Sequence, residues 1–564
     1  MKNYFNSFLL SFLFRFFYLI FISLLVISLG SPIYGTTDDY ILSSFIEGSF
    51  TGDSERISIF IEPLISFLIY YMQILLPFLN LYSLFLLLIL LLSLSIFGVL
   101  IDHLNSSMSL SAIWVILASG LTIWFVLNPT YTSASMLGSA INLTSLMILT
   151  SRKIKLNNQK FLLIFTSLLF TISYLIRPES GNAVIGIYLL FLIIKITLDL
   201  NTRNLIFKNY ILVLVTFSFI YALNFVISQN AKTDDWNKYN SWNSMRHQIQ
   251  QRLPEDKLLN LRTEIDWTVP EYHLFMNLAF GDAKEFNIKW LEPAFTKTKE
   301  YRGVTAFLNA DKNLIFQKTL ESFDKYKYLV FINLAVLILI LLVFKFNTFN
   351  YLFLLLSLMI IAIVYIYSSV TLHTPNRVIV PLLTMPILLT IYSIAIENIQ
   401  TRKKFFDTIF YLSTGVFIIT LVFIFYNQNS KNAFEISQAK IKNNFLHSFD
   451  MSGIFIGPVG TETYHLDSPY IKQSSIKLPI IFTTGNWETF SPHWFKRMEF
   501  LGLNKNSLYD NLFYKNVYWI SYPQPDNAYL VELYLNEKNY PNFSRKNLNQ
   551  HETGLAIYQF SEEK

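Results

Sequence analysis

Cysteine is absent from the 564 residues of this chain. Zinc ribbons, thiol catalysis, iron–sulfur clusters and disulfide bonds are therefore excluded, because all of them need cysteine. Charged residues are also scarce: they make up 15% of the chain, against about 25% in an average soluble domain. Residues of the AVILMFWYC class make up 53% of the sequence, and Phe, Tyr and Trp together 17%. This composition excludes a wholly soluble globular protein.

Long apolar runs indicate a polytopic membrane protein. The runs Leu81 to Ile101, Leu329 to Phe344 and Phe405 to Phe425 are at or near the length of about 20 residues that a helix needs to cross a bilayer. No small-residue cleavage site follows the first run, Phe16 to Leu29, so we expect an uncleaved first helix with a cytoplasmic N-terminus. Ten more spans are expected, at about 81–101, 109–127, 134–150, 160–176, 182–198, 209–228, 327–344, 350–370, 377–396 and 405–425.

The stretch Ile57 to Leu79 is apolar but contains Glu62, Pro63 and Pro77. If it crossed the membrane, every later loop would change sides, and the basic loop residues would face outward against the positive-inside rule. The basic residues concerned are Arg152, Lys153, Lys155, Lys160, Arg203, Lys208, Lys345, Arg402, Lys403 and Lys404. We therefore expect Ile57 to Leu79 to lie along the outer surface as an interfacial helix, which leaves about eleven spans.

Three regions then face the exterior: a first loop at 31–80, a large loop at 229–325 and the tail at 426–564. Apolar residues of the large loop recur at near-helical spacing in stretches such as Tyr272 to Trp290, so we expect this loop to be mostly helical. The tail alternates short apolar runs with Gly, Pro and Asn, which is typical of strands and turns. These runs are Gly453 to Ile456, Leu478 to Phe482, Val517 to Ile520 and Ala528 to Leu535.

These patterns predict an α-helical polytopic membrane protein with a helical exterior loop and a C-terminal exterior α/β domain. Residues 1–425 are expected to form the transmembrane domain, including the loops 31–80 and 229–325, and residues 426–564 the C-terminal domain. Both large exterior segments are electrically balanced, with 14 basic and 14 acidic residues at 229–325 and 13 of each at 426–564. The net charge of +6 therefore belongs to the membrane part, which argues against a nucleic-acid-binding protein.

The strongest chemical candidate is the sequence Gly35-Thr36-Thr37-Asp38-Asp39-Tyr40, just after the first span. Two adjacent carboxylates at the outer membrane surface repel each other beside a low-dielectric slab, so the pKa of at least one is expected to be perturbed. Such a carboxylate suits proton transfer as a general base. Two plainer interpretations remain: a pair of solvated acids that helps to retain the loop outside, or a cap on the helix that begins near Tyr40.

The acidic pair is followed by Glu47-Gly48, by Phe50-Thr51-Gly52-Asp53 and by Glu62-Pro63-Leu64-Ile65, which opens the interfacial helix. The order is a first helix, an acidic pair on the first exterior loop, an in-plane helix with an early proline, and then many spans. It resembles the GT-C class of membrane glycosyltransferases, in the architecture of its PMT and ArnT members. The resemblance covers roughly residues 1–425 and is architectural, because its specific residues are few.

The resemblance implies an inverting glycosyltransferase of hexosyl or pentosyl type, which moves a sugar from a polyprenyl-phosphate donor to a glycan, lipid or protein acceptor. It also implies a multi-pass protein of the bacterial plasma (inner) membrane that acts on the outer face in the assembly of cell-surface glycans. The C-terminal domain would then be extracytoplasmic. Membrane lipids are expected partners, and nucleic acid is not. Some members of the class use a divalent cation and others do not, so this question stays open, and no other cofactor is implied.

A phosphate leaving group needs nearby cations to neutralise its developing charge. Arg177 ends a span in Tyr174-Leu175-Ile176-Arg177-Pro178-Glu179, and Arg377 begins one in His373-Thr374-Pro375-Asn376-Arg377. The planar guanidinium fork matches phosphate oxygens, and similar outward arginines in GT-C enzymes contact the lipid phosphate. His373 lies near the same face and is a further candidate donor to phosphate. The alternatives are snorkelling to lipid headgroups and, for Arg177, pairing with Glu179.

Arg56, Glu62 and Glu179 are weaker candidates for substrate binding. Arg56 follows Glu55, so an ion pair on the loop is the plainer expectation. No cluster of His, Asp and Glu has clear metal-ligand spacing, and neither a GxxxxGK[ST] loop nor a nucleotide-binding βαβ pattern is visible, which disfavours nucleotide-driven chemistry. The exterior tryptophans suit sugar stacking but are expected mostly in domain cores: Trp236, Trp242, Trp267, Trp290, Trp487, Trp494 and Trp519.

Two other functions remain open. An O-antigen or capsule polymerase or ligase would also need outward arginines and a large exterior loop, although the early acidic pair and the large tail speak mildly against it. A lipid-glycan transporter or flippase would need charged or broken helices near the midplane and two similar halves, whereas these spans are nearly free of charge. For the glycosyltransferase, we expect Asp38 or Asp39 to be the base, with Arg377 and Arg177 on the phosphate.

Overall fold

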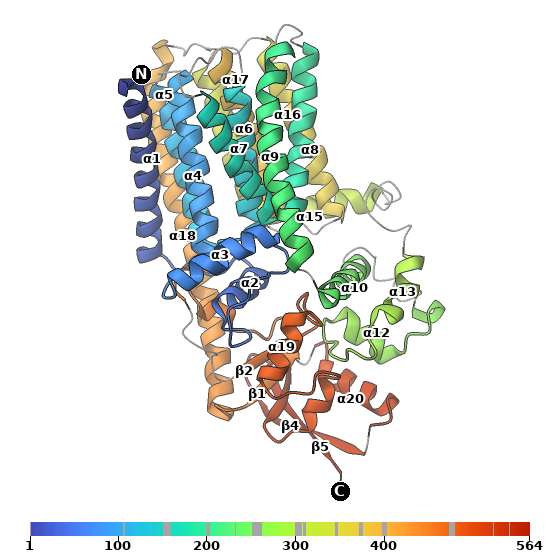
Figure 1. Cartoon of the computed structure of the whole chain (residues 1–564). Coiled ribbons are helices and arrows are strands. Elements are labelled where there is room, and N and C mark those ends of the chain that lie inside the picture. Colours follow the sequence, from blue (N-terminus) through green and yellow to red (C-terminus); the bar gives the residue numbers. More distant parts are fainter. Residues whose placement is uncertain are drawn as a thin grey trace.

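The structure is a computed structural model of the chain. The residues it describes are 2–104, 108–150, 159–198, 203–231, 233–250, 262–298, 307, 312–344, 348–371, 376–397, 403–472, 480–522, 524–540 and 542–563. They form a bundle of long helices, which contains the N-terminus, and a mixed domain below one end of the bundle, which contains the C-terminus (Figure 1).

Each of the eleven predicted spans corresponds to a long helix of the bundle. These helices are α1 (Lys2–Leu29), α4 (Leu81–Leu104), α5 (Met108–Leu127), α6 (Tyr131–Leu149), α7 (Gln159–Ile176), α8 (Pro178–Leu198), α9 (Arg203–Ala231), α15 (Lys312–Val343), α16 (Thr348–Thr371), α17 (Asn376–Glu397) and α18 (Lys403–Phe449). Within the described residues, 7 helices are long and apolar enough to cross a membrane, and Pro178–Ile193 and Leu354–Ser369 are shorter apolar helices. The prediction of a polytopic α-helical membrane protein is confirmed.

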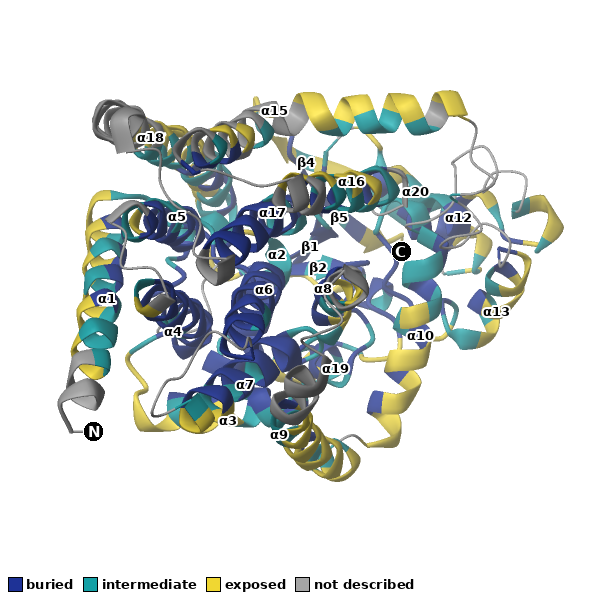
Figure 2. Ribbon diagram, turned by 90° about the horizontal axis from the view of Figure 1, so that it is seen from above, coloured by how far each residue is buried: buried dark blue, intermediate teal, exposed yellow. Residues whose placement is uncertain are grey.

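Helix α6 lies at the centre of the bundle, whereas α1 and α9 lie at its edge (Figure 2). In the apolar stretch of each helix, 94% of residues are buried in α6, against 22% in α1 and 17% in α9. Small residues allow neighbouring helices to approach α6 closely: a Cβ atom added at Gly138 would collide with the Ser173 side chain on α7. The outer helices expose large apolar side chains such as Phe14 and Phe219, as expected for surfaces that contact lipid.

A charged pair fixes α1 against α4 inside the bundle. The Arg15 guanidinium pairs with the Asp102 carboxylate and lies 4.0 Å from the centre of the Trp114 ring. Ser111 on α5 donates a hydrogen bond of 2.6 Å to the same carboxylate. Arg15 is buried, so loss of Asp102 would leave an unpaired buried charge, which is strongly destabilising. This pair therefore holds the peripheral α1 in place.

Two short helices close the end of the bundle that faces the mixed domain. They are α2 (Thr37–Glu47) and α3 (Pro63–Leu75), and α3 lies across the ends of the long helices (Figure 1). With 13 residues, α3 is too short to cross a bilayer, which needs about 20. One side of α3 is buried at Ile65 and Ile69, and the other exposes Leu68, Tyr71, Ile74 and Leu75. This is the arrangement predicted for an interfacial helix.

The described part of the large loop is mostly helical, as predicted. It contains α10 (Asp234–Gln250), α12 (Val269–Met276) and α13 (Ile288–Lys297). The stretch Tyr272 to Trp290 is not one helix, because α12 ends at Met276 and a new helix begins after Asn287. The Asn287 side-chain oxygen caps α13 by accepting a hydrogen bond of 3.3 Å from the backbone N–H of Trp290, as asparagine commonly does.

The tail folds as the predicted α/β domain, around a five-stranded sheet of order β2-β1-β3-β5-β4. Its strands are β1 (Ile454–Pro458), β2 (Ile480–Thr484), β3 (Val517–Ser521), β4 (Phe543–Gln550) and β5 (Ala556–Glu562). β1 pairs parallel with β2 and β3, and β5 pairs antiparallel with β3 and β4. Two helices pack with this sheet: α20 (Asn527–Glu537) contacts β3, and α19 (Pro492–Phe500) packs Trp494 against Phe482 of β2.

Three of the four apolar runs with strand character form strands, and the fourth prediction is wrong. Ala528 to Leu535 lies within the helix α20. Its buried residues include Ala528, Val531, Tyr534 and Leu535, a spacing of three and four that places them on one face of a helix. The run is almost continuously apolar, so its sequence shows no clear helical period.

The large loop and the tail share one hydrophobic core. Trp242 and Phe286 from the loop belong to the same cluster as Trp519 and Tyr534 from the tail. The Tyr534 hydroxyl also donates a hydrogen bond of 2.9 Å to Asp282. Helix α18, 47 residues long, runs from the bundle into this domain, so the predicted boundary between residues 425 and 426 falls inside a helix. Loop and tail thus form one body next to the bundle end that carries α2 and α3.

Candidate active site

Asp38 and Asp39 lie in the first turn of α2, next to that bundle end. Thr36 is the N-cap of this helix, and its hydroxyl oxygen accepts a hydrogen bond of 3.4 Å from the backbone N–H of Asp39. Acidic side chains are favourable in a first helical turn because the helix dipole is positive there. The two neighbouring carboxylates therefore point in different directions from the first turn of α2, and their surroundings differ.

Asp39 is completely buried, and each of its carboxylate oxygens accepts hydrogen bonds. The Thr36 hydroxyl donates to Oδ2 at 2.7 Å, and the Tyr82 hydroxyl donates to Oδ1 at 2.8 Å. The backbone N–H of Tyr131 also donates to Oδ1, at 2.7 Å. Burial raises the pKa of Asp39 to about 6, because desolvation of the charged form outweighs the hydrogen bonds that favour it. Asp39 thus connects α2, α4 and α6.

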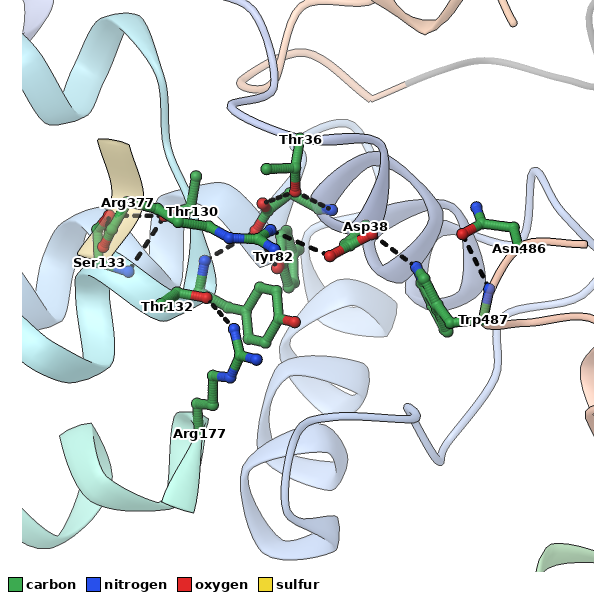
Figure 3. Close-up of polar contacts among 12 residues, drawn as sticks. Thr36, Asp38, Tyr82, Thr130, Thr132, Ser133, Arg177, Arg377, Asn486 and Trp487 are labelled. Atoms are coloured by element: carbon green, nitrogen blue, oxygen red, sulfur yellow. Dashed lines mark hydrogen bonds and ion pairs between the residues drawn. The ribbon is translucent and has the colours of Figure 1, made fainter. Parts of the chain in front are cut away.

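Asp38 is partly exposed and faces the space between the bundle and the domain. Its Oδ2 atom is 3.0 Å from Nη1 of Arg377, and both side chains are 21% exposed. The indole N–H of Trp487, from the tail, donates a hydrogen bond of 2.7 Å to Oδ1 (Figure 3). Asp38 is therefore the acid of the pair that solvent or a substrate can reach, held from both sides.

The start of α6 positions the two arginines. The Ser133 hydroxyl donates a hydrogen bond of 3.1 Å to the backbone carbonyl of Arg377, at the beginning of α17 (Figure 3). The Ser135 hydroxyl does the same for the carbonyl of Arg177, between α7 and α8, also at 3.1 Å. Both arginine segments are thereby fixed to one short piece of α6, and both arginine side chains start from the same bundle end.

The Arg177 guanidinium lies against the same piece of α6. Its Nη1 atom donates a hydrogen bond to the Thr132 hydroxyl (Figure 3). The group also lies 4.8 Å from the centre of the Tyr131 ring. Its Nε atom is buried and has no hydrogen-bond partner among the described residues. A cation held this way keeps N–H donors for an anion, and stacking on tyrosine leaves the planar fork oriented.

A loop after β2 brings Trp487 to Asp38. Gly485 adopts φ +74°, and a Cβ atom there would collide with the backbone of Leu278, so glycine is needed for this turn. The Tyr239 hydroxyl of α10 donates a hydrogen bond to the Trp487 carbonyl oxygen, and the Phe60 ring packs 4.7 Å from the indole. Trp487, a residue of the tail, therefore contacts both the first loop and the large loop.

Glu488, next to Trp487, is a second buried acid. It is 1% exposed, and its Oε1 atom accepts a hydrogen bond of 3.2 Å from the Thr483 hydroxyl. Burial raises its pKa to about 8, so at neutral pH this carboxyl group is mostly protonated. Among Asp38, Asp39 and Glu488, only Asp38 is both partly exposed and next to an arginine.

The weaker predicted residues lie outside this cluster. Arg56 is exposed, 5.6 Å from the centre of the Tyr70 ring on α3. The expected ion pair with Glu55 is wrong, because Glu55 pairs with Lys496 of the tail at 2.7 Å, a partner that is distant in the sequence. Glu62 accepts a hydrogen bond of 2.8 Å from Asn224 and so attaches α3 to α9.

The remaining two predicted residues are Glu179 and His373. Glu179 is exposed in the first turn of α8, and His373 lies outside the described residues. No group of three or more His, Asp or Glu side chains that could hold a metal ion is present in the described ranges.

Trp487 and the hydroxyl residues of α6 were missed as site residues by the sequence analysis. Trp487 was one of several exterior tryptophans expected in domain cores, and nothing local distinguishes it, since it lies 449 positions from Asp38. The α6 residues had a signal. The sequence Thr130-Tyr131-Thr132-Ser133-Ala134-Ser135 has five hydroxyl side chains in six positions at the start of a span, where polar residues are costly and often functional.

No protein-family model matches the chain, and no curated protein matches it. The structure is similar to a crystal structure of ArnT from Cupriavidus metallidurans bound to undecaprenyl phosphate, with a TM-score of 0.44 and 10% identity over 96% of this chain and 97% of that one. It is also similar to ArnT from the same organism in the apo state, with a TM-score of 0.41 and 10% identity over 96% of each chain. A likeness this remote concerns the fold alone, so the function must be inferred from the residues of the site.

The substitution Asp39→Asn tests the buried state of this carboxylate. Its folded pKa of about 6 exceeds the ordinary value of 3.8, so the folded state binds the proton more tightly than the unfolded state. This contribution to stability is therefore complete below about pH 4 and is lost as the pH rises through 6. It amounts to about 3 kcal/mol for a difference of about two pKa units. Asparagine can donate to Thr36 and still accept from Tyr82 and Tyr131.

We expect Asp39→Asn to gain stability relative to the wild type as the pH rises from 4 to 6.5, with no further gain above that. The measurement is thermal unfolding of the purified protein in detergent at a series of pH values. Glu179→Gln, which removes an exposed acid, is the control and should show no such trend. A difference between Asp39→Asn and the wild type that is constant across this range would contradict the assignment.

Proposed function

We propose that this protein is a membrane glycosyltransferase that moves a sugar from a polyprenyl-phosphate donor to an acceptor on the outer face of the membrane. The observation that carries the proposal is the position of Asp38: a partly exposed carboxylate between Arg377 and Trp487 at one end of the helix bundle. A lipid-linked sugar presents its anomeric carbon at that depth, next to the headgroup region. A base and two phosphate-binding cations are therefore needed in the same place.

In the proposed reaction, Asp38 takes the proton of an acceptor hydroxyl while that oxygen attacks the anomeric carbon of the donor. A bond forms between the acceptor oxygen and the anomeric carbon, and the bond from that carbon to the phosphate oxygen breaks. The electron pair of the broken bond leaves with the polyprenyl phosphate. Because the attacking and leaving oxygens lie on opposite sides of the carbon in one displacement, the configuration is inverted.

Arg377 and Arg177 are proposed to stabilise the charge that develops on the leaving phosphate. Arginine has five N–H donors, and the contacts above use one of them on Arg377, toward Asp38. The other donors of Arg377 can bind a phosphate, whose negative charge then competes with Asp38 for the single positive charge of the guanidinium. Donor binding would then release the carboxylate from its ion pair while Trp487 continues to hold it, so the base becomes available only when the donor is present.

The same interpretation gives the placement in the membrane. The exposed apolar side of α3 (Leu68, Tyr71, Ile74 and Leu75) suits the membrane interface, and the candidate site lies at the same bundle end. The positive-inside rule places that end outside, with the N-terminus in the cytoplasm. We therefore propose a multi-pass protein of the bacterial inner membrane that acts in the assembly of cell-surface glycans, with a glycan, lipid or protein acceptor.

The pair Asp38→Asn and Asp39→Asn tests the division of roles between neighbouring acids. We expect Asp38→Asn to lower transfer by about 100-fold or more, the usual effect of losing a general base. We expect Asp39→Asn to keep transfer within about fivefold of the wild type at pH 7, because Asp39 is fully hydrogen-bonded and remote from solvent. The measurement is transfer from a panel of radiolabelled undecaprenyl-phosphate sugars to a membrane extract, by protein reconstituted in lipid.

Equal transfer by Asp38→Asn and the wild type would overturn the catalytic assignment, and so would absence of product from every donor with the wild type. Each variant is first compared with the wild type by size-exclusion profile and thermal unfolding. Loss of activity then cannot be confused with loss of fold.

Trp487→Phe tests whether the tail positions the base. Phenylalanine keeps an aromatic ring against Phe60 but removes the N–H that donates to Asp38. Hydrogen bonds to charged groups contribute about 1.5–3 kcal/mol, so we expect kcat to fall by about 10- to 100-fold while the donor KM changes little. Trp519→Phe is the matched control, because Trp519 is buried in β3 and its indole N–H has no partner among the described residues. A loss of kcat that is equal in both variants would show a structural effect only.

A further inference from the structure

We propose that a groove beside Trp487 binds an acidic saccharide, which would be the glycan part of the acceptor. This inference rests on the proposed function and names the class of substrate that enters the site from the domain side. The groove is a cavity of about 800 Å³ lined by α10, by the turn that leads into α13, and by α19 with the residues just before it. A cavity of that size accommodates several sugar rings, since small-molecule sites measure about 300–1,000 Å³.

Aromatic side chains form a rigid part of the wall. Trp242, Phe490 and Phe495 all line the cavity. The indole N–H of Trp242 donates a hydrogen bond of 2.7 Å to the carbonyl oxygen of Phe286, and its ring lies edge-on to Phe490 at 4.9 Å. Phe490 stacks in turn on Phe495, with centres 6.4 Å apart. Trp242 is 4% exposed and supports the wall from behind, whereas Phe490 and Phe495 are half-buried and present apolar surface, which suits the C–H faces of sugar rings.

The backbone at this wall is strained. Phe490 adopts φ +64°, a conformation that is uncommon for residues other than glycine and is energetically unfavourable. The cost is offset by the packing of its ring, which touches Trp242, Phe280 and Trp494 as well as Phe495. Strain of this kind concentrates at binding and catalytic sites. Here the strained backbone orients the ring of Phe490 in the groove wall.

The lining of the groove is positively charged, although the segments that build it are not. Its charged residues are Lys238, Lys289, Lys496, Lys505, Asp235 and Glu499, a balance of four positive against two negative charges. The large loop and the tail, by contrast, each contain equal numbers of basic and acidic residues. Lys505 pairs with Glu499 at 2.5 Å, and Lys496 pairs with Glu55 and Asp53 of the first loop. The positive charge left for an anion therefore lies on the large-loop side of the groove, at Lys238 and Lys289, where it favours anions by charge complementarity.

Two of these lysines are available to a ligand. Lys289 is exposed and forms no ion pair within the described part of the chain. Lys238 is 3.8 Å from Asp235, with side chains 75% and 79% exposed, so this pair contributes little and is easily exchanged. Lys496 is different: it pairs with Glu55 of the first loop at 2.7 Å and so connects the tail to the bundle end.

The groove and the candidate base share a wall. Tyr239 lines the groove and donates a hydrogen bond to the carbonyl oxygen of Trp487. The indole of Trp487 in turn donates to Asp38. A saccharide seated on the aromatic wall would therefore lie two side chains from the carboxylate. Aromatic faces next to lysine ammonium groups select a sugar that carries carboxylate or phosphate, and they disfavour a neutral or cationic one.

Fluorescence anisotropy on the full-length protein in lipid nanodiscs tests this inference without a donor. The probes are labelled pentagalacturonic acid, which presents carboxylates, phosphomannopentaose, which presents a phosphate, and neutral maltopentaose. We expect saturable binding of at least one acidic probe and at least tenfold weaker binding of the neutral probe. The Lys238→Gln, Lys289→Gln double variant is expected to weaken acidic binding at least fivefold. The Lys515→Gln, Lys546→Gln double variant removes two exposed lysines that do not line the groove and should match the wild type.

The acidic probe that binds identifies the source of the anion. No binding of either acidic probe, equal binding of the neutral one, or equal losses in both double variants would overturn the inference. These outcomes are distinguishable from failure of the proposed function: a protein that transfers sugar but binds no acidic probe is a glycosyltransferase without this groove specificity. If the protein binds the probe through Lys238 and Lys289 but transfers sugar from no donor, the groove proposal holds and the proposed glycosyltransferase function is wrong.

Discussion

The first turn of α6 holds together the segments that carry the candidate site. Its backbone N–H at Tyr131 binds Asp39, Ser133 binds the carbonyl of Arg377, and Thr132 binds the Arg177 side chain. These partners come from α2, from α17 and from the connection between α7 and α8, so one buried helix end fixes three distant parts of the chain. Polar contacts in a low-dielectric interior are costly when incomplete. The spacing of the carboxylates and the guanidinium groups is therefore a property of the packed bundle.

This constraint explains why the two neighbouring aspartates differ. Asp39 is the group through which α2 is attached to α4 and α6, and its pKa is raised to about 6 because burial dominates. Its full set of donors leaves Asp38, the next residue along the same turn, turned toward the space between bundle and domain. There the tail supplies Trp487 as a second partner. In the proposed function one acid builds the site and the other reacts, and the domain takes part in the chemistry through a single hydrogen bond.

Much of the fold could be predicted from the sequence, because its signals are local. Uncharged runs of about 20 residues predict spans, and the positions of loop lysines and arginines predicted that α3 lies in the interface. Of the site, the acidic pair and both arginines were predicted from their positions at span ends. The choice between Asp38 and Asp39 could not be made, because burial depends on Tyr82 and the start of α6. Trp487 could not be found either, since its partner is 449 positions away and nothing local distinguishes it from core tryptophans. The helix over Ala528 to Leu535 was mistaken for a strand because a continuous apolar run has no clear period.

The central claim is that Asp38 and the donor phosphate compete for Arg377. The most direct test is equilibrium binding of undecaprenyl phosphate to the wild type, Asp38→Asn and Arg377→Gln in nanodiscs. If the claim holds, Asp38→Asn binds the lipid phosphate about tenfold more tightly than the wild type, because Arg377 is released from the ion pair. Arg377→Gln binds the lipid phosphate more weakly than the wild type. Equal affinity in all three proteins would show that the phosphate does not bind at Arg377 and would contradict the proposed site.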